Sequence, residues 1–470
     1  MSFPHETQVL VVGAGPVGLA AAITLTQLGI NVTIVEASSA THKGARASVV
    51  HARTLEVLKT VNIAKPLIDK GTPVDHFTIR GSTEELLHVD FNLLKKDTQF
   101  PFALLISQEL VEKIFVNELN NLGGKVHLNK KAINIQPIND SDKVEVFFED
   151  GTRIITSYII GADGIHSLVR KTAGISFNDP FTGKPYDDPN ATDAFVVILS
   201  DLYLKEPYPE QISHKAFTVH ADHFFFLLPL QSVDDKDGLF WRVGIGFPPN
   251  TELPKYPTQE DVQKLINERN PWPTPMVVSS IISASRYRVR AAQANTYYSK
   301  IGNTNVLLAG DAAHIHSPAG GQGMNLGICD AVAAAEAIHA HIHSSSPKEE
   351  RDGIFAGYST RRHIVGRRVI EMTKVLSLIA NSGRLHGWKR LLRNAIFFVV
   401  NRVEFAKRAF VWRMSGLINR DQSSDIKQKK MWAKYYDDTV TIRLHKYPRG
   451  QMEPSFTHRG RMLNTFSFDN

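Results

Sequence analysis

The chain has 470 residues, of which 43% are hydrophobic and 21% are charged, and it contains one cysteine. This composition is typical of a globular protein with a sizeable core, and it excludes a disordered chain, a disulfide framework and a zinc site built from several cysteines. The net charge is +7, but residues 351–470 carry 24 Lys or Arg against 9 Asp or Glu. The basic excess therefore lies in the last quarter of the chain, a placement that does not favour a nucleic-acid-binding protein.

The first predicted elements form a strand–helix–strand unit. The apolar run at residues 8–12 predicts a buried parallel strand, and residues 14–28 predict an Ala/Leu-rich helix that ends before Gly29. Residues 31–35 predict a second short strand, which ends at Glu36. Further helices are predicted at 53–67 and 109–122, and further strands at 125–127, 144–148 and 153–160.

Residues 176–290 differ in character from the residues before them. A loop rich in Pro, Asp and Gly at 179–190 precedes several strand-like segments, which indicates a mostly antiparallel sheet inserted into the first domain. These strands are predicted at 195–204, 223–230, 239–247 and 277–289, with one helix at 258–269. A buried strand at 306–309 and two long helices at 324–341 and 353–380 follow.

A glycine motif lies between the first strand and the first helix. Gly13 permits a tight turn, Gly15 lets the backbone approach a pyrophosphate, and Gly18 allows close packing of helix on strand. The helix N-terminus then faces phosphate charge, and Glu36 can accept a hydrogen bond from a ribose hydroxyl. In this context the motif predicts a dinucleotide site; a turn that is Gly-rich only for packing is the alternative.

Two further motifs place an aspartate directly after a predicted strand. Asp163 follows the strand at 153–160, and Asp311 follows the strand at 306–309. Ligands of open α/β sheets bind at the carboxyl ends of the strands, so both aspartates are candidates for a ligand site. For Asp163 an ordinary Asp-Gly turn is an equally simple explanation.

A glycine-rich loop precedes the first of the two long helices. Pro318 fixes its backbone, and Gly320 and Gly321 let it pass close to a flat or bulky group. The N–H groups of this loop lead into the helix, which suits partial negative charge. His314 and His316 have no third candidate metal ligand nearby, so we expect them to pack or form hydrogen bonds, and we predict no metal site.

The three motifs in this order resemble those of the class A flavin-dependent monooxygenases, the para-hydroxybenzoate hydroxylase type, and in particular its phenol-hydroxylase-like branch. The segments Gly44-Ala-Arg46-Ala, His51-Ala-Arg53-Thr-Leu-Glu56 and Ile106-Ser-Gln108-Glu-Leu110 are also similar to that family. The resemblance covers residues 8–380 and is weakest over 176–285. No second strand–GxGxxG–helix unit is present, as in this family, where NAD(P)H visits the FAD domain only transiently.

The resemblance implies a set of site residues. One group would hold the ADP part, the ribitol chain and the isoalloxazine ring of FAD, and Arg46 would also help to place NAD(P)H. Three residues, Arg46, Pro318 and Gly321, are expected beside the reacting atoms. The implied cofactor-binding residues are Gly13, Gly15, Gly18, Glu36, Arg46, Gln108, Asp163, Asp311, Gly320, Gly321 and Asn325.

The resemblance also implies a reaction. NAD(P)H would reduce FAD, reduced FAD would bind O2 as a C4a-hydroperoxyflavin, and the distal oxygen would hydroxylate an aromatic, phenol-like or polyketide substrate. Epoxidation of an alkene and a non-catalytic scaffold of the same fold are the alternatives; the intact loop at residues 320–325 argues against the scaffold. The expected partners are the substrate, O2 and NAD(P)H, without nucleic acid, and the oligomeric state is left open.

The inserted sheet is expected to cover the flavin and to bind the substrate. The aromatic run Phe224-Phe225-Phe226, together with Trp241, could line an apolar pocket that would take an aromatic ring. His223, Phe225 and Trp241 are the candidate substrate contacts. An ordinary place in the core of the sheet is the alternative for all three. The residue that would deprotonate a phenol is not assigned.

These observations predict an α/β architecture with a Rossmann-like FAD-binding domain. Its segments would be residues 1–75, 100–175 and 286–385, and the mostly antiparallel substrate domain would take 76–99 and 176–285. Residues 386–470 would form a helical C-terminal extension.

The extension allows two interpretations. Apolar residues between 391 and 414 recur at helical spacing on one face, and basic residues lie off that face. A helix pair of this kind could dock on the FAD domain, or it could serve as an interfacial membrane anchor. The single cysteine and the absence of a signal sequence favour a cytoplasmic protein, with peripheral membrane contact as an addition.

Overall fold

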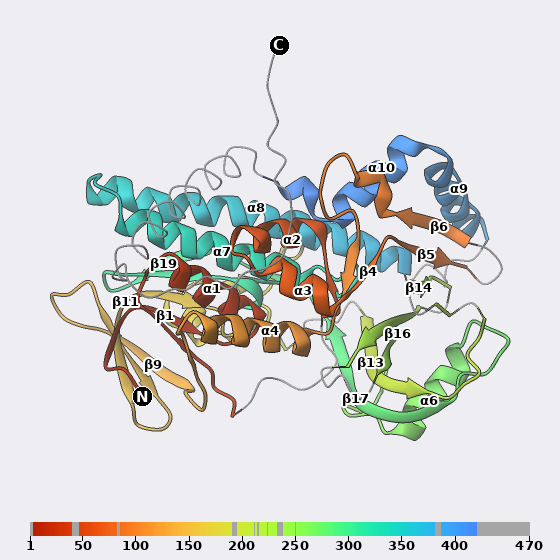
Figure 1. Ribbon diagram of the computed structural model, residues 1–470, viewed down its shortest axis with the longest axis horizontal. Coiled ribbons are helices and arrows are strands. Elements are labelled where there is room, and N and C mark those ends of the chain that lie inside the picture. The colour runs from red at the N-terminus through yellow and green to blue at the C-terminus, as the bar shows by residue number, and fades with distance from the viewer. Residues whose placement is uncertain are drawn as a thin grey trace, which may run out of the picture. The chain divides into compact units, whose positions relative to one another are not determined.

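The fold combines a mainly parallel sheet covered by helices with a mainly antiparallel sheet, as the sequence predicts (Figure 1). The computed structural model describes residues 3–39, 47–81, 85–189, 195–210, 212–213, 216–222, 224–232, 238–249, 251–380 and 387–420. Arg46, His223 and the last 50 residues of the predicted extension lie outside these ranges.

The first sheet has β1 near its centre. The strand order is β19-β20-β11-β1-β2-β8, and β1 pairs in parallel with both β11 and β2. Strand β10 adds an antiparallel hairpin partner to β11 and carries β9 on its other side. The strands are β1 (Glu6–Val12), β2 (Val32–Val35), β8 (Val126–His127), β9 (Ala132–Pro137), β10 (Val144–Phe148), β11 (Arg153–Gly161), β19 (Tyr298–Ile301) and β20 (Thr304–Leu308).

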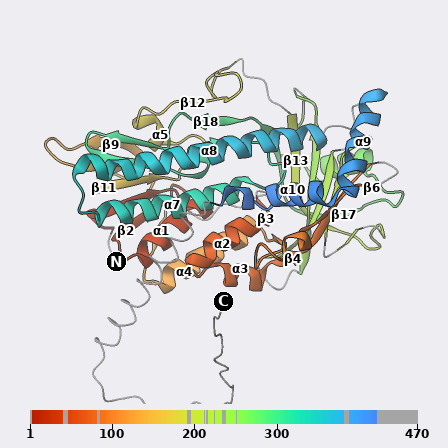
Figure 2. The same cartoon turned by 90° about the horizontal axis from the view of Figure 1, so that it is seen from above.

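Helix α1 (Pro16–Gln27) is buried because it is apolar on nearly every side. Its residues from Leu19 to Ile23 are fully inaccessible to solvent. Helix α7 (Gly323–Ile342) packs against it, and α8 (Lys348–Ala380) runs beside α7 (Figure 2). The helices that complete this part are α2 (Ala52–Thr60), α3 (Ala64–Lys70), α4 (Gln108–Asn121) and α5 (Leu168–Thr172).

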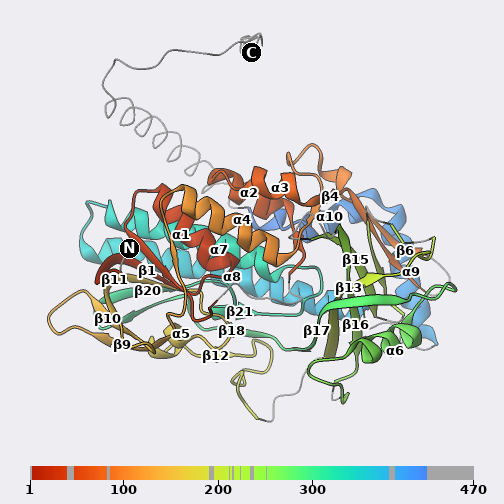
Figure 3. The ribbon, with the colours of Figure 1, turned by 60° about the horizontal axis from the view of Figure 1, so that its bottom comes forward.

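The second sheet has the order β17-β13-β16-β15-β14-β5-β6, and all of its pairs are antiparallel except β14 with β5. Strands β5 and β6, which lie between β2 and β8 in the chain, thus share one sheet with β13 to β17, which follow β11 (Figure 3). One face packs against α6 (Gln259–Arg269). The strands are β5 (His76–Arg80), β6 (Glu85–Asp90), β13 (Phe195–Leu204), β14 (Phe217–His220), β15 (Phe225–Gln231), β16 (Leu239–Phe247) and β17 (Val278–Val289).

Two small three-stranded sheets complete the fold. Strand β18 lies between β12 and β21, and β7 lies between β3 and β4. The sequence pattern did not predict these strands, because two or three residues are too few to show an alternation. Their bounds are β3 (Val49–Val50), β4 (Thr72–Val74), β7 (Ala103–Leu105), β12 (Phe177–Asn178), β18 (Ala292–Ala294) and β21 (His314–Ile315).

The helix expected at 53–67 is in fact two helices. Asn62, between α2 and α3, adopts φ 57°, a left-handed conformation that asparagine tolerates and that ends a helix. The strand expected at 223–230 is β15, which begins at Phe225, and the preceding strand β14 was not predicted.

The C-terminal part of the described chain is helical. It comprises α9 (Trp388–Arg402) and α10 (Glu404–Met414), followed by the short 3-10 helix η4 (Leu417–Asn419). Helix α9 packs on β6, and α10 packs on the 3-10 helix η1 (Phe91–Leu94). Among the described residues, no helix has the length and hydrophobicity that a membrane span requires.

Candidate active site

The three sequence motifs meet at one edge of the parallel sheet. Val12 of β1 pairs with Gly161 of β11, and Gly161 pairs in turn with Leu308 of β20. Each strand therefore ends level with its neighbour, and the turns that follow lie side by side. This is the edge of an open α/β sheet at which ligands bind.

The three glycines of the first motif serve three different purposes. Gly13 has φ 102°, and a Cβ there would lie 2.3 Å from the carbonyl oxygen of Ala162. A Cβ on Gly18 would lie 1.8 Å from the carbonyl oxygen of Gly13, so this glycine lets α1 approach the turn. A Cβ on Gly15 would meet no protein atom within 4 Å. The space before Gly15, at the N-terminus of α1, is therefore open to a phosphate group.

Glu36 follows β2, and its carboxylate accepts hydrogen bonds from the glycine turn and from the residues that follow Glu36 itself. Its Oε2 accepts from the Ala14 N–H at 2.9 Å, and its Oε1 accepts from the Ser38 N–H at 3.0 Å. The carboxylate thus fixes the glycine turn itself. A carboxylate has about four acceptor positions, so a ribose hydroxyl can still donate to it.

Asp163 contributes a buried acceptor at the same edge. Its Oδ2 accepts from the Val169 N–H at 3.1 Å, whereas its Oδ1 has no hydrogen-bond partner among the described residues. Burial raises the pKa of this carboxyl, and its hydrogen bonds oppose that effect. A buried acceptor without a partner is costly, so this oxygen fits a ligand that brings a hydroxyl or N–H donor.

The loop at residues 316–323, which contains Pro318, Gly320 and Gly321, is held from several sides. Asn325 accepts from the His51 N–H at 2.8 Å and donates to the carbonyl oxygens of Val49 and Gly321 at 2.8 and 2.7 Å. Gln322 donates to the carbonyl oxygens of Gly320 and Met414, both at 3.0 Å. The side chain of Asn325 therefore positions the loop.

His51, at the start of α2, also supports this loop. Its Nε2 lies 2.8 Å from the carbonyl oxygen of Gly320, so this nitrogen carries the proton and donates it. Burial lowers the pKa of His51 to about 4. The ring is therefore neutral at physiological pH, as a buried histidine with a carbonyl partner should be.

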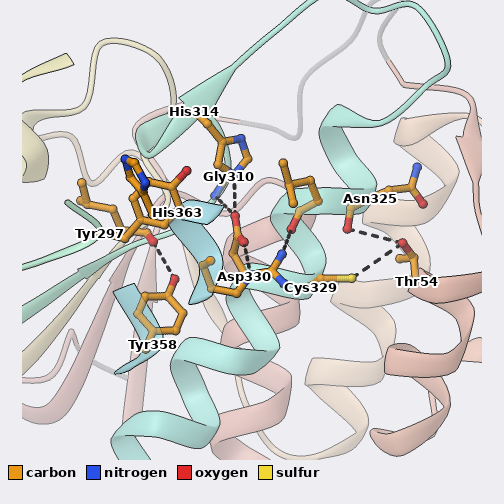
Figure 4. Close-up of polar contacts among 12 residues, drawn as sticks. Thr54, Tyr297, Gly310, His314, Asn325, Cys329, Asp330, Tyr358 and His363 are labelled. Carbon is orange, nitrogen blue, oxygen red and sulfur yellow. Dashed lines mark hydrogen bonds and ion pairs between the residues drawn. The ribbon is translucent and has the colours of Figure 1, made fainter. Parts of the chain in front are cut away.

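A buried charge cluster lies under the turn that carries Asp311 (Figure 4). Asp330 of α7 accepts from His314 Nε2 at 2.6 Å, from the Gly310 N–H at 3.3 Å and from Arg362 Nε at 2.6 Å. Burial alone would raise the pKa of Asp330, but the charges and hydrogen bonds of Arg362 and His314 lower it below its usual value. The cluster fixes the Gly310 turn and leaves Asp311 exposed on the outer side.

The two histidines before the loop form hydrogen bonds, as the sequence predicts. His314 pairs with Asp330, and His316 Nδ1 donates to the carbonyl oxygen of Ser317 at 2.8 Å. Within the described ranges, His, Cys, Asp and Glu form no group of three or more that could hold a metal ion.

The carbonyl of Ala47 links the second sheet to the start of α4. It accepts from the Gln108 N–H and from Arg242 Nη1, both at 3.0 Å. Arg242 and Asp201, on adjacent strands of the second sheet, form a buried two-point ion pair with distances of 2.7 and 2.8 Å. The Gln108 side chain contacts the Ala47 N–H at 3.3 Å and Glu112 at 2.9 Å.

The second sheet presents different aromatic residues on its two faces. Phe225 and Trp241 lie in the core that packs against α6 and Trp272. The face that carries Arg242 instead holds Phe224 and Phe226, whose rings lie over glycines. A Cβ on Gly244 would lie 2.0 Å from Phe226, and a Cβ on Gly246 would lie 1.2 Å from Phe224.

This placement changes the candidates for substrate contact. Phe225 and Trp241, predicted from the aromatic run, have a core-packing role, because alternate residues of a strand point to opposite faces. Phe224 and Phe226, on the face that carries Arg242, are the better candidates. His223 lies outside the described residues.

Several residues of the site have no distinctive sequence signal. His51, Asp330 and Arg362 act through partners that are far away in the chain, so spacing alone does not reveal them. Arg242 interrupts an otherwise apolar strand and is visible in the sequence for that reason, but its contacts with Asp201 and Ala47 are not.

Comparison with known proteins agrees with this geometry. A family model described as "FAD binding domain" matches residues 6–373. Among curated proteins, an uncharacterized aromatic compound monooxygenase of Bacillus subtilis is 30% identical over 374 residues, which cover 78% of this chain and 67% of that protein. The 6-methylpretetramide 4-monooxygenase of Streptomyces rimosus is 28% identical over 374 residues, 79% of this chain and 62% of that protein. The chain thus spans less than two thirds of the Streptomyces relative.

Solved structures share the fold. The p-nitrophenol 4-monooxygenase of Pseudomonas putida aligns with a TM-score of 0.71 at 24% identity, and the alignment covers 89% of this chain and all of that one. At this identity the match bears on the fold alone.

Proposed function

The chain belongs to the FAD binding domain family, and from this premise we propose that it is an FAD-dependent monooxygenase that uses NAD(P)H and O2 to hydroxylate an aromatic substrate. The observation that carries the proposal is the convergence of the three motifs on an open edge of the parallel sheet. The monooxygenase names of the relatives support hydroxylation over a non-catalytic scaffold and do not favour an epoxidase.

The residues at this edge fit FAD. The open space before Gly15 admits a pyrophosphate, and the N-terminus of α1 favours its charge. Glu36 is placed for a ribose hydroxyl, and the unpartnered oxygen of Asp163 for a donor on the cofactor. When bound and reduced by NAD(P)H, FAD supplies the activation of O2.

The protein's own part in the reaction is to position the partners and to exclude water. The 316–323 loop is held by Asn325, Gln322 and His51, so its backbone N–H groups keep fixed directions. Fixed dipoles of this kind stabilise developing charge without a cost of reorganisation. Asp311 and Gln108 stay proposals for the ribitol chain, and Pro318, Gly320 and Gly321 for the border of the flavin ring. Arg46 keeps its proposed place near the flavin and NAD(P)H.

The substrate would lie on the face of the second sheet that carries Phe224, Phe226 and Arg242. The partly buried ring of Phe226 lies over Gly244, beside the buried Phe224, and offers an apolar surface that suits an aromatic ring. The guanidinium of Arg242 has hydrogen-bond donors and no acceptor, so it can attract a phenolate but is not a base for a phenol. The surface fits a phenol or a polyketide.

The test is made on the purified full-length protein. It should be yellow, with flavin absorption near ~450 nm, and a panel of phenols should stimulate NADPH or NADH oxidation. Under 18O2 the product of the active substrate should gain one labelled oxygen atom. A colourless protein that cannot be loaded with FAD would refute the proposal, and so would NAD(P)H oxidation that yields only hydrogen peroxide with every phenol and polyketide tested.

A further inference from the structure

Helix α9 has its polar and apolar sides reversed. Arg393, Phe397 and Asn401 are spaced by four residues and form the side that contacts the rest of the described protein. Arg393 pairs with Asp222 at 2.6 Å. Asn401 donates to the carbonyl oxygen of Leu86 at 2.7 Å and accepts from the His88 N–H at 3.2 Å. Two of these three inward side chains are therefore polar.

The opposite side of α9 is apolar and exposed. Leu391 is 69% exposed and Trp388 is 68% exposed, and Phe405, just beyond the helix, is 81% exposed. Figure 1 and Figure 2 both show α9 beside β6 at the outer edge of the described part of the chain. The other large apolar side chains exposed here are Leu392, Ile396, Phe398, Val399 and Val403.

Such a face needs an explanation, because it leaves many large apolar groups in water. Burying a side chain of this size is worth about 1.5–3 kcal/mol, and contiguous exposed apolar patches mark interaction sites. The inward polar contacts fix the orientation of the helix, so the apolar side cannot turn inward without breaking the Arg393–Asp222 pair.

The charges near this face show what it fits. Residues 387–420 contain eight Lys or Arg and one Asp or Glu. Three of the eight pair with core carboxylates: Arg393 with Asp222, Arg408 with Asp97 and Arg420 with Glu56. Arg402 lies 3.6 Å from the ring centre of Phe398, at the border of the apolar face. An exposed apolar helix side with Arg402 at its border, in a segment with an excess of basic residues, fits the pattern of a helix that lies in a membrane interface.

We propose that the outward side of α9, with Phe405, is a docking surface for an anionic lipid membrane. The apolar side chains would enter the boundary between headgroups and acyl chains, and the basic residues would contact anionic headgroups. A second copy of the chain fits less well, because a two-fold contact would bring the same basic residues together. The proposal does not depend on the reaction proposed above, since membrane binding needs no substrate.

The test is flotation of the full-length protein with vesicles. Wild-type protein should float with phosphatidylcholine vesicles that contain about 30% phosphatidylserine, and at least about tenfold less with pure phosphatidylcholine vesicles, since each basic residue near an anionic surface is worth about 1 kcal/mol. Raising the salt to about 0.5 M should weaken binding, because it screens the charges.

Paired substitutions show whether α9 is the surface. The double variant Leu391→Ser/Val399→Ser should bind anionic vesicles at least about tenfold more weakly, because two buried apolar groups are lost. The matched control is Ile133→Ser/Ile282→Ser, two residues that are each 51% exposed but lie on β9 and β17. This control should bind like wild type, and both variants should retain FAD.

Three outcomes would overturn the proposal. The first is wild-type protein that does not float with anionic vesicles. The second is equal binding by both double variants, which would place the surface elsewhere. The third is a wild-type dimer in sedimentation velocity that Leu391→Ser/Val399→Ser converts to a monomer without any vesicle binding, which would assign the face to a second copy.

Discussion

At the scale of single residues, the first motif separates binding from packing. Gly15 and Gly18 are both part of the same glycine motif, but only Gly18 is in contact with other protein atoms where a side chain would project. The sequence motif predicts a different role for each glycine, and the surroundings of the two residues agree with those roles.

This difference gives a paired prediction. Gly15→Ala should leave the unfolding free energy of the FAD-free protein within about 0.5 kcal/mol of wild type, because the new methyl meets no protein atom. Its affinity for FAD should fall at least about tenfold, because the methyl occupies the space of the pyrophosphate. Urea unfolding and flavin fluorescence titration measure the two quantities.

Gly18→Ala is the matched control. Its Cβ would lie 1.8 Å from the Gly13 carbonyl oxygen, so it should destabilise the FAD-free protein by about 1–3 kcal/mol. If Gly15→Ala bound FAD as tightly as wild type, the pyrophosphate would not lie before Gly15.

At the scale of elements, the 316–323 loop depends on histidines that are uncharged. Burial lowers the pKa of His51 and of His316 to about 4, whereas both groups titrate near 6.5 in an unfolded chain. Between pH 6.5 and 4 the unfolded chain therefore binds protons that the folded protein does not. Stability is fully present above pH 6.5 and falls as the pH is lowered through this window.

The pH dependence is a prediction for this element. Each of the two histidines should lower the free energy of unfolding by about 1.4 kcal/mol per pH unit below 6.5, and by up to ~3 kcal/mol at pH 4. His51→Gln, whose amide can still donate to Gly320, should remove the share of His51 from that slope. Urea unfolding of the FAD-free protein at several pH values between 8 and 4.5 measures it. An unchanged slope in the variant would show that His51 is not buried as a neutral ring.

Elements also show how far sequence reasoning reaches. Long apolar or periodic segments such as α1, α7 and β16 agree with expectation within a few residues, because their patterns repeat several times. The break at Asn62 was missed, because one residue's backbone angle ends an element without changing its hydrophobic pattern. The two- and three-residue strands of the two small sheets were missed for lack of any repeat.

At the scale of the whole described molecule, Arg242 joins the second sheet to a segment that is distant in the sequence. It pairs with Asp201 inside the second sheet and donates to the carbonyl oxygen of Ala47, between β2 and β3, which also accepts from the Gln108 N–H at the start of α4. A buried ion pair costs much desolvation and persists only with good geometry. The pair therefore holds Arg242 in position for its contact with Ala47.

Breaking this pair gives the prediction at this scale. Asp201→Asn should lower the unfolding free energy by about 3–5 kcal/mol, because the Arg242 charge stays buried without its partner. The exposed pair Lys65–Asp69 provides the control, and Asp69→Asn should cost less than about 1 kcal/mol. Thermal or urea unfolding compares the two. A loss below about 1 kcal/mol for Asp201→Asn would mean that water reaches the pair.

The sequence by itself determined the family and the edge of the parallel sheet at which the three motifs meet. Glycine spacing, strand-end aspartates and their order are local properties, and the parallel sheet brings them together because its strands end at one edge. The same holds for the mostly antiparallel character of the second sheet.

Only the tertiary structure decided which side each residue faces. It turned Phe224 and Phe226, in place of Phe225 and Trp241, to the face that carries Arg242, and it turned the apolar side of α9 outward. It also joined Asp330 to Arg362 and Ala47 to Arg242 across long stretches of chain. Periodicity shows that a helix or strand has two sides, but which side is buried depends on the partner that packs against it, and that partner is distant in the sequence.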